Sequence, residues 1–335
     1  MPDWAIATRA DTHWEVAAPD DDVDAGGLNA VVAELMAQPP ELGLTQALVV
    51  VHRGGIIAEA YGPHVDADTQ LISWSMAKSI THALVGLLVG DGLLDVEAPA
   101  PVAAWAGDQR RDITLQHLLN MRDGLDFAED YVGDEGVSDV LEMLFGEGKD
   151  DHAAYAIARP LAHPPGSVWS YSSGTSNIVA RIVGDAVGGT EAATRALLRD
   201  RLFDPIGMGA ADPRFDAAGT FVGSSYVYAS ARDFARFGAL YLHDGVWNGR
   251  RLLPEGWLDH ARAWTAHDPD NGFDYGAHWW IWPDQPGSLA AHGYEGQYTI
   301  VLPEKDAVVV RLGKSPVELR PALVTKLREL LATLP

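Results

Sequence analysis

Ser75 and Lys78, in the stretch Ser-Met-Ala-Lys, are the residues of this chain whose types and spacing most directly suggest chemistry. In a helix, residues i and i+3 lie on one face, one turn apart, so the lysine amine can reach the serine hydroxyl. A serine near a helix start also lies beside unpaired backbone N–H groups and the positive end of the helix dipole, which stabilise an oxyanion. The pair therefore predicts acyl transfer with Ser75 as the nucleophile.

The same four residues have a plainer interpretation, a helix cap followed by a solvated lysine. The residues that follow Lys78 argue against it, because the stretch to Val89 is almost wholly apolar and predicts a buried helix. A charge that enters such a helix usually has a partner or a chemical role. We therefore expect Lys78 to act on Ser75.

A second motif is Tyr171-Ser172-Ser173, which follows a Pro-Pro-Gly turn and precedes a helix that we expect to begin near Ser176. A tyrosine on a loop at an interface can serve as a general acid or base if a nearby lysine lowers its pKa. The alternative is a core tyrosine whose hydroxyl is simply hydrogen-bonded. On this motif alone both interpretations stay open.

A third motif covers residues 291–297, which read Ala-His-Gly-Tyr-Glu-Gly-Gln and lead into an apolar run. Glycines beside the start of a strand allow a substrate to lie close to the backbone and pair with it. A simple turn is the alternative.

The remaining pattern indicates how these motifs are positioned. Helical spacing marks residues 27–38, an apolar pair around Arg53-Gly54-Gly55 predicts a hairpin, and residues 75–203 are mostly helical. The last third predicts a helix at 230–245, strands at 277–283, 297–303 and 307–313, and a closing helix at 321–334. We expect an α/β domain made of residues 1–74 and 212–335, a helical domain of residues 75–211, and an active site at their interface.

Composition excludes several classes of function. The chain has 335 residues, and its 47 acidic and 24 basic residues give a net charge of -23, so we expect neither a nucleic acid nor a membrane partner. It has no cysteine, its first residues carry charges where a secretory signal is apolar, and we expect a cytoplasmic protein. No Gly-x-Ser-x-Gly, His-Glu-x-x-His or phosphate-loop pattern occurs, so we expect no metal and no cofactor. A monomer and a homodimer are both compatible with the sequence.

Taken together and in this order, the three motifs resemble the serine β-lactamase and penicillin-recognising superfamily, whose class A signature is Ser-x-x-Lys, Ser-Asp-Asn and Lys-Thr-Gly. Tyr171-Ser172-Ser173 is similar to the second motif of class C β-lactamases, family VIII carboxylesterases and 6-aminohexanoate-dimer (nylon oligomer) hydrolases. The resemblance extends over nearly the whole chain, through residues 113–125, 231–257, 277–283 and 292–313. It implies a β-lactamase/transpeptidase-like fold, with an antiparallel sheet flanked by helices from both termini and an all-helical lobe.

The 6-aminohexanoate-dimer hydrolase branch is the most similar, because of the Ser-Met-Ala-Lys-Ser and Tyr-Ser-Ser-Gly motifs and residues 126–136. This resemblance implies that Tyr171 and Lys78 share the proton of Ser75. It implies that the backbone N–H groups of Ser75 and Tyr294 form the oxyanion hole. We expect the substrate to be bound by Tyr131, Ser173, His292, Gly293 and Glu129.

One departure narrows the chemistry. The Lys-Thr-Gly motif is replaced by Ala291-His292-Gly293, so the lysine that helps to bind a β-lactam carboxylate is missing. His292 could substitute in part, although a neutral imidazole is its usual form at pH 7. We therefore expect a serine hydrolase of small esters or linear amides. A weak β-lactamase, a D-amino-acid peptidase and a penicillin-binding module without turnover are the alternatives.

Overall fold

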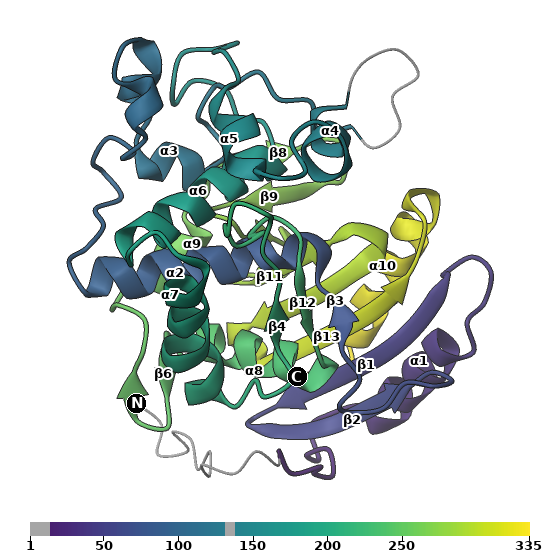
Figure 1. The fold of residues 1–335 in the computed structure, drawn as a ribbon. Helices are drawn as coiled ribbons and strands as arrows, with labels where there is room; N and C mark the ends of the chain where they lie inside the picture. Colours follow the sequence, from purple (N-terminus) through teal and green to yellow (C-terminus); the bar gives the residue numbers. More distant parts are fainter. Residues whose placement is uncertain (1–13, 131–137) are drawn as a thin grey trace.

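The centre of the fold is an antiparallel sheet with the strand order β2-β1-β13-β12-β11-β10-β9-β8 (Figure 1). The structure is a computed structural model that describes residues 14–130 and 138–335. Strands from both ends of the chain lie side by side in the sheet. Its members are β1 (Leu44–His52), β2 (Gly55–Tyr61), β8 (Ala266–Asp268), β9 (Phe273–Tyr275), β10 (Trp280–Ile281), β11 (Leu289–Gly293), β12 (Gln297–Leu302) and β13 (Ala307–Lys314).

Short strands form two smaller sheets, and helices cover both faces of the large one. The order β3-β5-β4 joins residues from distant parts of the chain, and β6 pairs with β7. These strands are β3 (Leu71–Ile72), β4 (Asp212–Pro213), β5 (Val227–Ala229), β6 (Val246–Trp247) and β7 (Arg250–Arg251). The α-helices are α1 (Ala25–Met36), α2 (Ala77–Gly90), α3 (Leu115–Leu119), α4 (Asp139–Phe145), α5 (His152–Ile157), α6 (Ser173–Ala186), α7 (Glu191–Ala196), α8 (Ala231–Leu242), α9 (Trp257–Arg262) and α10 (Arg320–Leu331).

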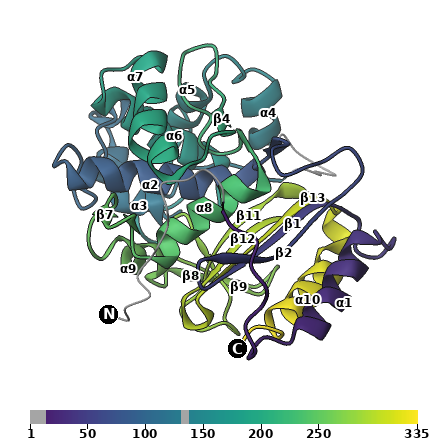
Figure 2. The ribbon, with the colours of Figure 1, turned by 90° about the horizontal axis from the view of Figure 1, so that it is seen from below.

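Strand β1 shows how the sheet separates two cores. Successive side chains of a strand point to opposite faces, and Val49 and Val51 belong to the buried cluster that also contains residues of α2, α6 and α8. Leu48 and Val50 instead pack with α1 and α10. Figure 2 shows α1 and α10 side by side on one face of the sheet, with α8 on the other. Because the strand is buried on both faces, its sequence is an apolar run without alternation.

Helices α2 and α6 pack together on the same side of the sheet as α8. Helix α2 is buried along almost its whole length and contacts α6. This burial explains why the α2 sequence has apolar residues on all sides. None of the described helices is long and apolar enough to cross a membrane.

Most elements expected from the sequence are present, and some boundaries differ. The hairpin turns between His52 and Gly55, and the expected closing helix and the strands at 297–303 and 307–313 form, whereas the strand expected at 277–283 is confined to Trp280–Ile281. The helix expected from Ser176 begins instead at Ser173, because the Ser172 side chain accepts a hydrogen bond from the backbone N–H of Thr175 at 3.1 Å and caps the helix. The division of the chain into two domains stays a prediction.

Candidate active site

Ser75 lies in a tight turn, Trp74–Met76, that leads directly into α2. The preceding residue Ser73 fixes this turn to β5, since its backbone N–H donates to the Val227 carbonyl at 2.9 Å and its hydroxyl accepts from the Val227 N–H at 3.1 Å. Trp74 has a φ of 44°, in the left-handed region. Ser75 therefore lies on a constrained turn at the start of α2, one turn before Lys78.

Lys78 is one turn further along and is 2% exposed. Its Nζ donates to Ser75 Oγ at 3.1 Å, to Ser173 Oγ at 3.0 Å and to the Ser224 carbonyl at 3.1 Å. Burial lowers the pKa of Lys78 to about 8, and the nearby Glu129 carboxylate offsets part of that shift. The structure thus brings together the two residues of the first motif.

Tyr171 lies beside the same two residues. The Lys78 Nζ is 4.8 Å from the centre of the Tyr171 ring. Burial raises the pKa of Tyr171, and hydrogen bonds with the side chains of Ser75 and Trp280 lower it in part. The Tyr171 ring thus lies beside the Lys78 amine, and the phenol is neutral at pH 7.

Ser173 and Glu129 complete this side of the site. Ser173 is the first residue of α6 and is fully buried. Its backbone N–H donates to Glu129 Oε2 at 2.7 Å, and its hydroxyl donates to Glu129 Oε1 at 2.6 Å. The carboxylate therefore reaches Lys78 through Ser173, an arrangement that the motif alone does not indicate.

The third motif forms the opposite side of the site. Strand β11 ends at Gly293 beside the Ser75 turn, where a Cβ on Gly293 would lie 2.3 Å from the Ser73 carbonyl oxygen. The next residue, Tyr294, packs edge-on against Trp74, with ring centres 5.7 Å apart. The backbone after β11 thus comes close to the Ser75 turn only because residue 293 is glycine.

Two residues expected at the site are placed differently or are not described. His292 stacks on Trp280 with ring centres 5.3 Å apart, and its Nε2 accepts from the Trp282 indole at 2.9 Å. Burial lowers the pKa of His292 to about 3, so the ring is neutral and cannot replace the missing lysine cation at pH 7. Its contact with substrate stays a prediction. Tyr131 lies outside the described residues.

This geometry was compared with known proteins. The Beta-lactamase family model matches residues 28–334. The chain belongs to the beta-lactamase family. Its predicted family and fold class are thereby confirmed.

Individual members of the family show the same relationship. The chain is 26% identical over 309 residues to a 6-aminohexanoate-dimer hydrolase of Paenarthrobacter ureafaciens, which covers 86% of this chain and 78% of the relative. A solved structure of a candidate 6-aminohexanoate-dimer hydrolase from Bacillus anthracis matches with a TM-score of 0.75 and 22% identity, over 96% of this chain and 89% of that one. A family VIII carboxylesterase matches with a TM-score of 0.67 and 15% identity, over 93% and 98%.

An aromatic wall lies beside Tyr171 in this beta-lactamase-family protein, and the sequence alone does not show which tryptophans and tyrosines form it. Tyr171 lies 5.3 Å from Trp280 and 5.9 Å from Tyr275, measured between ring centres, and Trp169 packs behind them. The Tyr275 hydroxyl and the Trp169 indole N–H are buried and have no hydrogen-bond partner within residues 14–130 and 138–335. The sequence does not distinguish these wall residues from the other tryptophans and tyrosines, because aromatic residues are common in cores.

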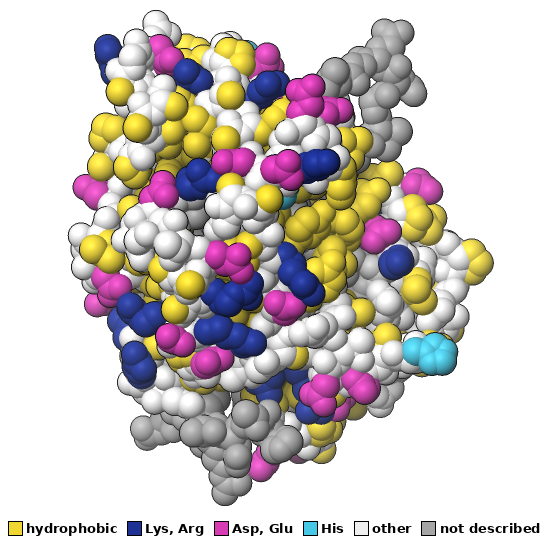
Figure 3. Space-filling view, viewed as in Figure 1, with side chains coloured by type: hydrophobic (Ala, Val, Ile, Leu, Met, Phe, Trp, Pro, Cys, Tyr) yellow, Lys and Arg dark blue, Asp and Glu magenta, His cyan; other side chains and the backbone are white. Residues whose placement is uncertain are grey.

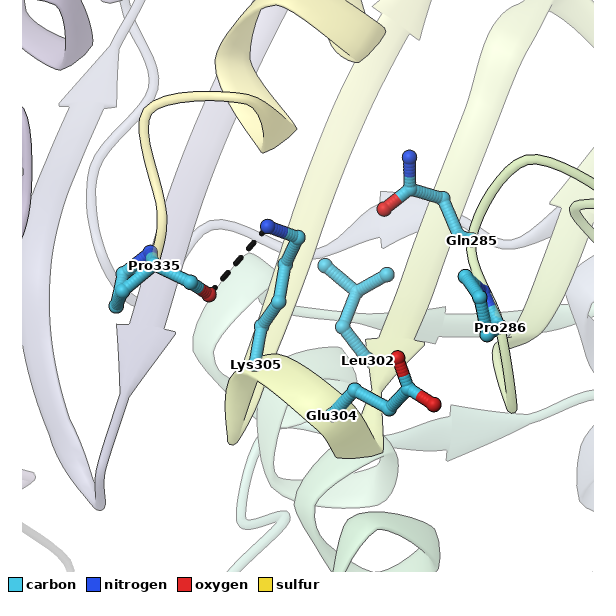
Figure 4. A pocket seen from close by; sticks show the side chains of 6 residues that line it. All are labelled: Gln285, Pro286, Leu302, Glu304, Lys305 and Pro335. Atoms are coloured by element: carbon cyan, nitrogen blue, oxygen red, sulfur yellow. Dashed lines mark hydrogen bonds between the residues drawn. The ribbon is translucent and has the colours of Figure 1, made fainter.

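The surface of the molecule has a hollow and a separate pocket. Figure 3 shows hydrophobic side chains gathered in a hollow between the part of the molecule that carries α4 and the part that carries α10. A separate pocket at the C-terminus is lined by Gln285, Pro286, Leu302, Glu304, Lys305 and Pro335 (Figure 4). It contains none of the residues discussed above, and Lys305 Nζ is engaged there with the carbonyl oxygens of Leu334 and Pro335. In the part of the chain that the structure describes, no cluster of three or more histidines and acidic residues could hold a metal ion.

Proposed function

We propose that the protein hydrolyses small esters or linear amides through an acyl-enzyme on Ser75. The observation that carries this proposal is the contact of Ser75 Oγ with Lys78 Nζ at 3.1 Å, in a position where the lysine is buried and the Tyr171 ring lies 4.8 Å from Nζ. Membership of the beta-lactamase family supports it, as does the similarity to a 6-aminohexanoate-dimer hydrolase and, in fold, to a family VIII carboxylesterase.

The first step forms the acyl-enzyme. The Ser75 oxygen attacks the substrate carbonyl carbon, and its proton passes to the Lys78 and Tyr171 pair. The tetrahedral intermediate then collapses, and the bond to the leaving alcohol or amine breaks as that group takes up the proton. In the second step water adds to the acyl carbon, and the same pair takes a proton from the water and returns one to Ser75. The products are a carboxylic acid and regenerated enzyme.

The protonation states suit this proton transfer. With a Lys78 pKa of about 8, about one lysine in ten is neutral at pH 7, against fewer than about one in a thousand for an ordinary lysine. Burial raises the pKa of Tyr171, so both groups are shifted toward their neutral forms. Because they lie together, they titrate as one system, and the proton accepted from Ser75 belongs to the pair.

The developing oxyanion requires donors on the opposite side. We assign this role to the backbone N–H groups of Ser75 and Tyr294, and the close approach of Gly293 to the Ser73 carbonyl supports this assignment. Removing one donor from such a pair usually costs about 100- to 1000-fold in kcat. Only proline removes a backbone N–H, and it also changes the path of the backbone, so the positions of these donors are tested through Gly293.

The test is a substrate panel of p-nitrophenyl esters, 6-aminohexanoate dimer and nitrocefin, with wild type, Ser75→Ala and Tyr171→Phe. We expect turnover of esters or of the linear dimer by the wild type, a slower reaction with Tyr171→Phe, and none with Ser75→Ala. Nitrocefin is expected to be the poorest substrate, because position 291, where the Lys-Thr-Gly motif has its lysine, is occupied by alanine. Mass spectrometry of the stopped reaction would show the acyl group on Ser75. Full activity in Ser75→Ala would refute the proposal.

A further inference from the structure

The Glu129 carboxylate has a defined role in the hydrogen bonds around Lys78. It accepts two hydrogen bonds from one residue, the N–H and the hydroxyl of Ser173, at 2.7 and 2.6 Å. Ser173 is the first residue of α6, a 14-residue helix, so the carboxylate also lies at the positive end of a helix dipole. Glu129 is therefore held firmly in one orientation.

The direction of each hydrogen bond follows from the protons available. A carboxylate only accepts, so the single hydroxyl proton of Ser173 points to Glu129. The Ser173 oxygen must then accept from Lys78 Nζ, which lies 3.0 Å away. The chain of donors therefore runs from Lys78 through Ser173 to Glu129.

Lys78 in turn uses all of its protons. An ammonium has three N–H groups, and Nζ has three acceptors, Ser75 Oγ, Ser173 Oγ and the Ser224 carbonyl. Neither the Ser224 carbonyl nor the oriented Ser173 hydroxyl can return a proton to the nitrogen. When Lys78 is neutral it has one N–H fewer, and of the three acceptors only the Ser75 hydroxyl can reverse its hydrogen bond. Ser75 then donates its own proton to the amine. The surroundings thus direct the lone pair of Lys78 toward Ser75.

Three titratable side chains from separate parts of the chain face Lys78, and one of them is charged. Glu129 acts through Ser173 and favours the ammonium. Tyr171 is neutral, and its ring lies 4.8 Å from Nζ. His278 is also neutral, because burial lowers its pKa to about 3, and the hydrogen bond of its Nδ1 with the Leu119 carbonyl at 2.8 Å offsets only part of that shift. Glu129 is therefore the negative group that balances the Lys78 charge among the described residues that act on it.

We propose that Glu129 is a positioning residue that acts through Ser173 to orient the Lys78 amine and to raise its affinity for the proton of Ser75. This rests on the proposed function, in which Lys78 accepts that proton. Without the carboxylate, the buried lysine would be a weaker base and its hydrogen bonds would lose their fixed direction. A purely structural role, in which Glu129 only caps α6, would leave the proton affinity of Lys78 unchanged.

The chain offers a direct measurement of this effect. It has five lysines, Lys78, Lys149, Lys305, Lys314 and Lys326, so NMR of protein labelled with 13C at the lysine ε-carbon gives few signals. The Lys78 signal is the one lost in Lys78→Met. Its titration would be followed in wild type, in Glu129→Gln, which keeps the shape and one acceptor oxygen, and in Asp130→Asn. Asp130 is exposed and adjacent, so it is the matched control for removal of one negative charge.

We expect the Lys78 titration midpoint to move down by about one pH unit in Glu129→Gln, because an opposite charge is removed, and to stay in place in Asp130→Asn. An unchanged midpoint in a folded Glu129→Gln protein would overturn the proposal, as would an equal shift in Asp130→Asn. The pH profile of kcat/KM for a p-nitrophenyl ester should show its Lys78-dependent inflection moving by the same amount. If the midpoint moves but neither wild type nor variant turns over any substrate, the proposed function fails and the role of Glu129 in holding the Lys78 charge stands.

Discussion

Replacing Gly293 by alanine tests how the two sides of the site meet. A Cβ at this position would lie 2.3 Å from the Ser73 carbonyl oxygen and 2.8 Å from the Gln297 Cβ. Ordinary contacts between such atoms are about 3.5 Å, so the backbone would have to move apart by about 1 Å. The close approach of β11 to the Ser75 turn could not be kept.

Neither neighbour can yield without consequence. Ser73 is held from behind by two hydrogen bonds with Val227, and its carbonyl accepts from the Met76 N–H at 3.3 Å, which closes the Ser75 turn. On the other side, Gly293 pairs with Gln297 in the sheet. Relief of the clash must therefore displace either Ser75 or the backbone at Tyr294. A displacement of about 1 Å at reacting groups can lower the rate about 100-fold.

The assay is hydrolysis of a p-nitrophenyl ester, with the folded state checked by circular dichroism. We expect Gly293→Ala to lower kcat/KM about 100-fold, and overpacking to lower the free energy of unfolding by about 1–3 kcal/mol. The control is Gly107→Ala, whose Cβ would meet no atom within 4 Å, and which should leave kcat/KM unchanged. Wild-type activity in Gly293→Ala would refute the assignment of this backbone to the oxyanion hole.

Two further predictions concern stability. Burial lowers the pKa of His278 to about 3, so below pH 6.5 the unfolded chain binds a proton that the folded protein does not, and stability falls as pH falls from 6.5 toward 3. Between pH 7 and pH 5 this residue should cost about 2 kcal/mol, and urea unfolding of His278→Gln should show a pH dependence shallower by that amount. Arg311 is fully buried and donates to the carbonyls of Leu44 and Gly296, so Arg311→Met leaves both without this donor. We expect a loss of at least about 2 kcal/mol by the same measurement, and an unchanged unfolding midpoint would contradict the argument.

The local parts of the site could be predicted from the sequence. Ser75 and Lys78 lie within one turn, so their contact follows from helix geometry and needs no knowledge of the fold. The hairpin at Arg53 and the closing strands were likewise predicted, because apolar runs and turn residues are local signals. The start of α6 was placed three residues late, since Ser172 and Ser176 are both suitable caps and only packing decides between them.

The contacts that set the proton affinity of Lys78 could not be predicted from local sequence signals, for two different reasons. Glu129 reaches Ser173 from 44 residues away, and in the sequence it resembles the other acids of a solvated loop. Ser224 contributes through its carbonyl, a group that every residue carries, so no residue type could reveal it. A buried lysine ammonium needs three acceptors whatever their source, and the two sequence motifs supply two of them, Ser75 and Ser173. The third acceptor, the Ser224 carbonyl, depends on where the fold carries the backbone past Lys78. The Ser-x-x-Lys motif therefore locates the nucleophile but does not determine the proton affinity of Lys78.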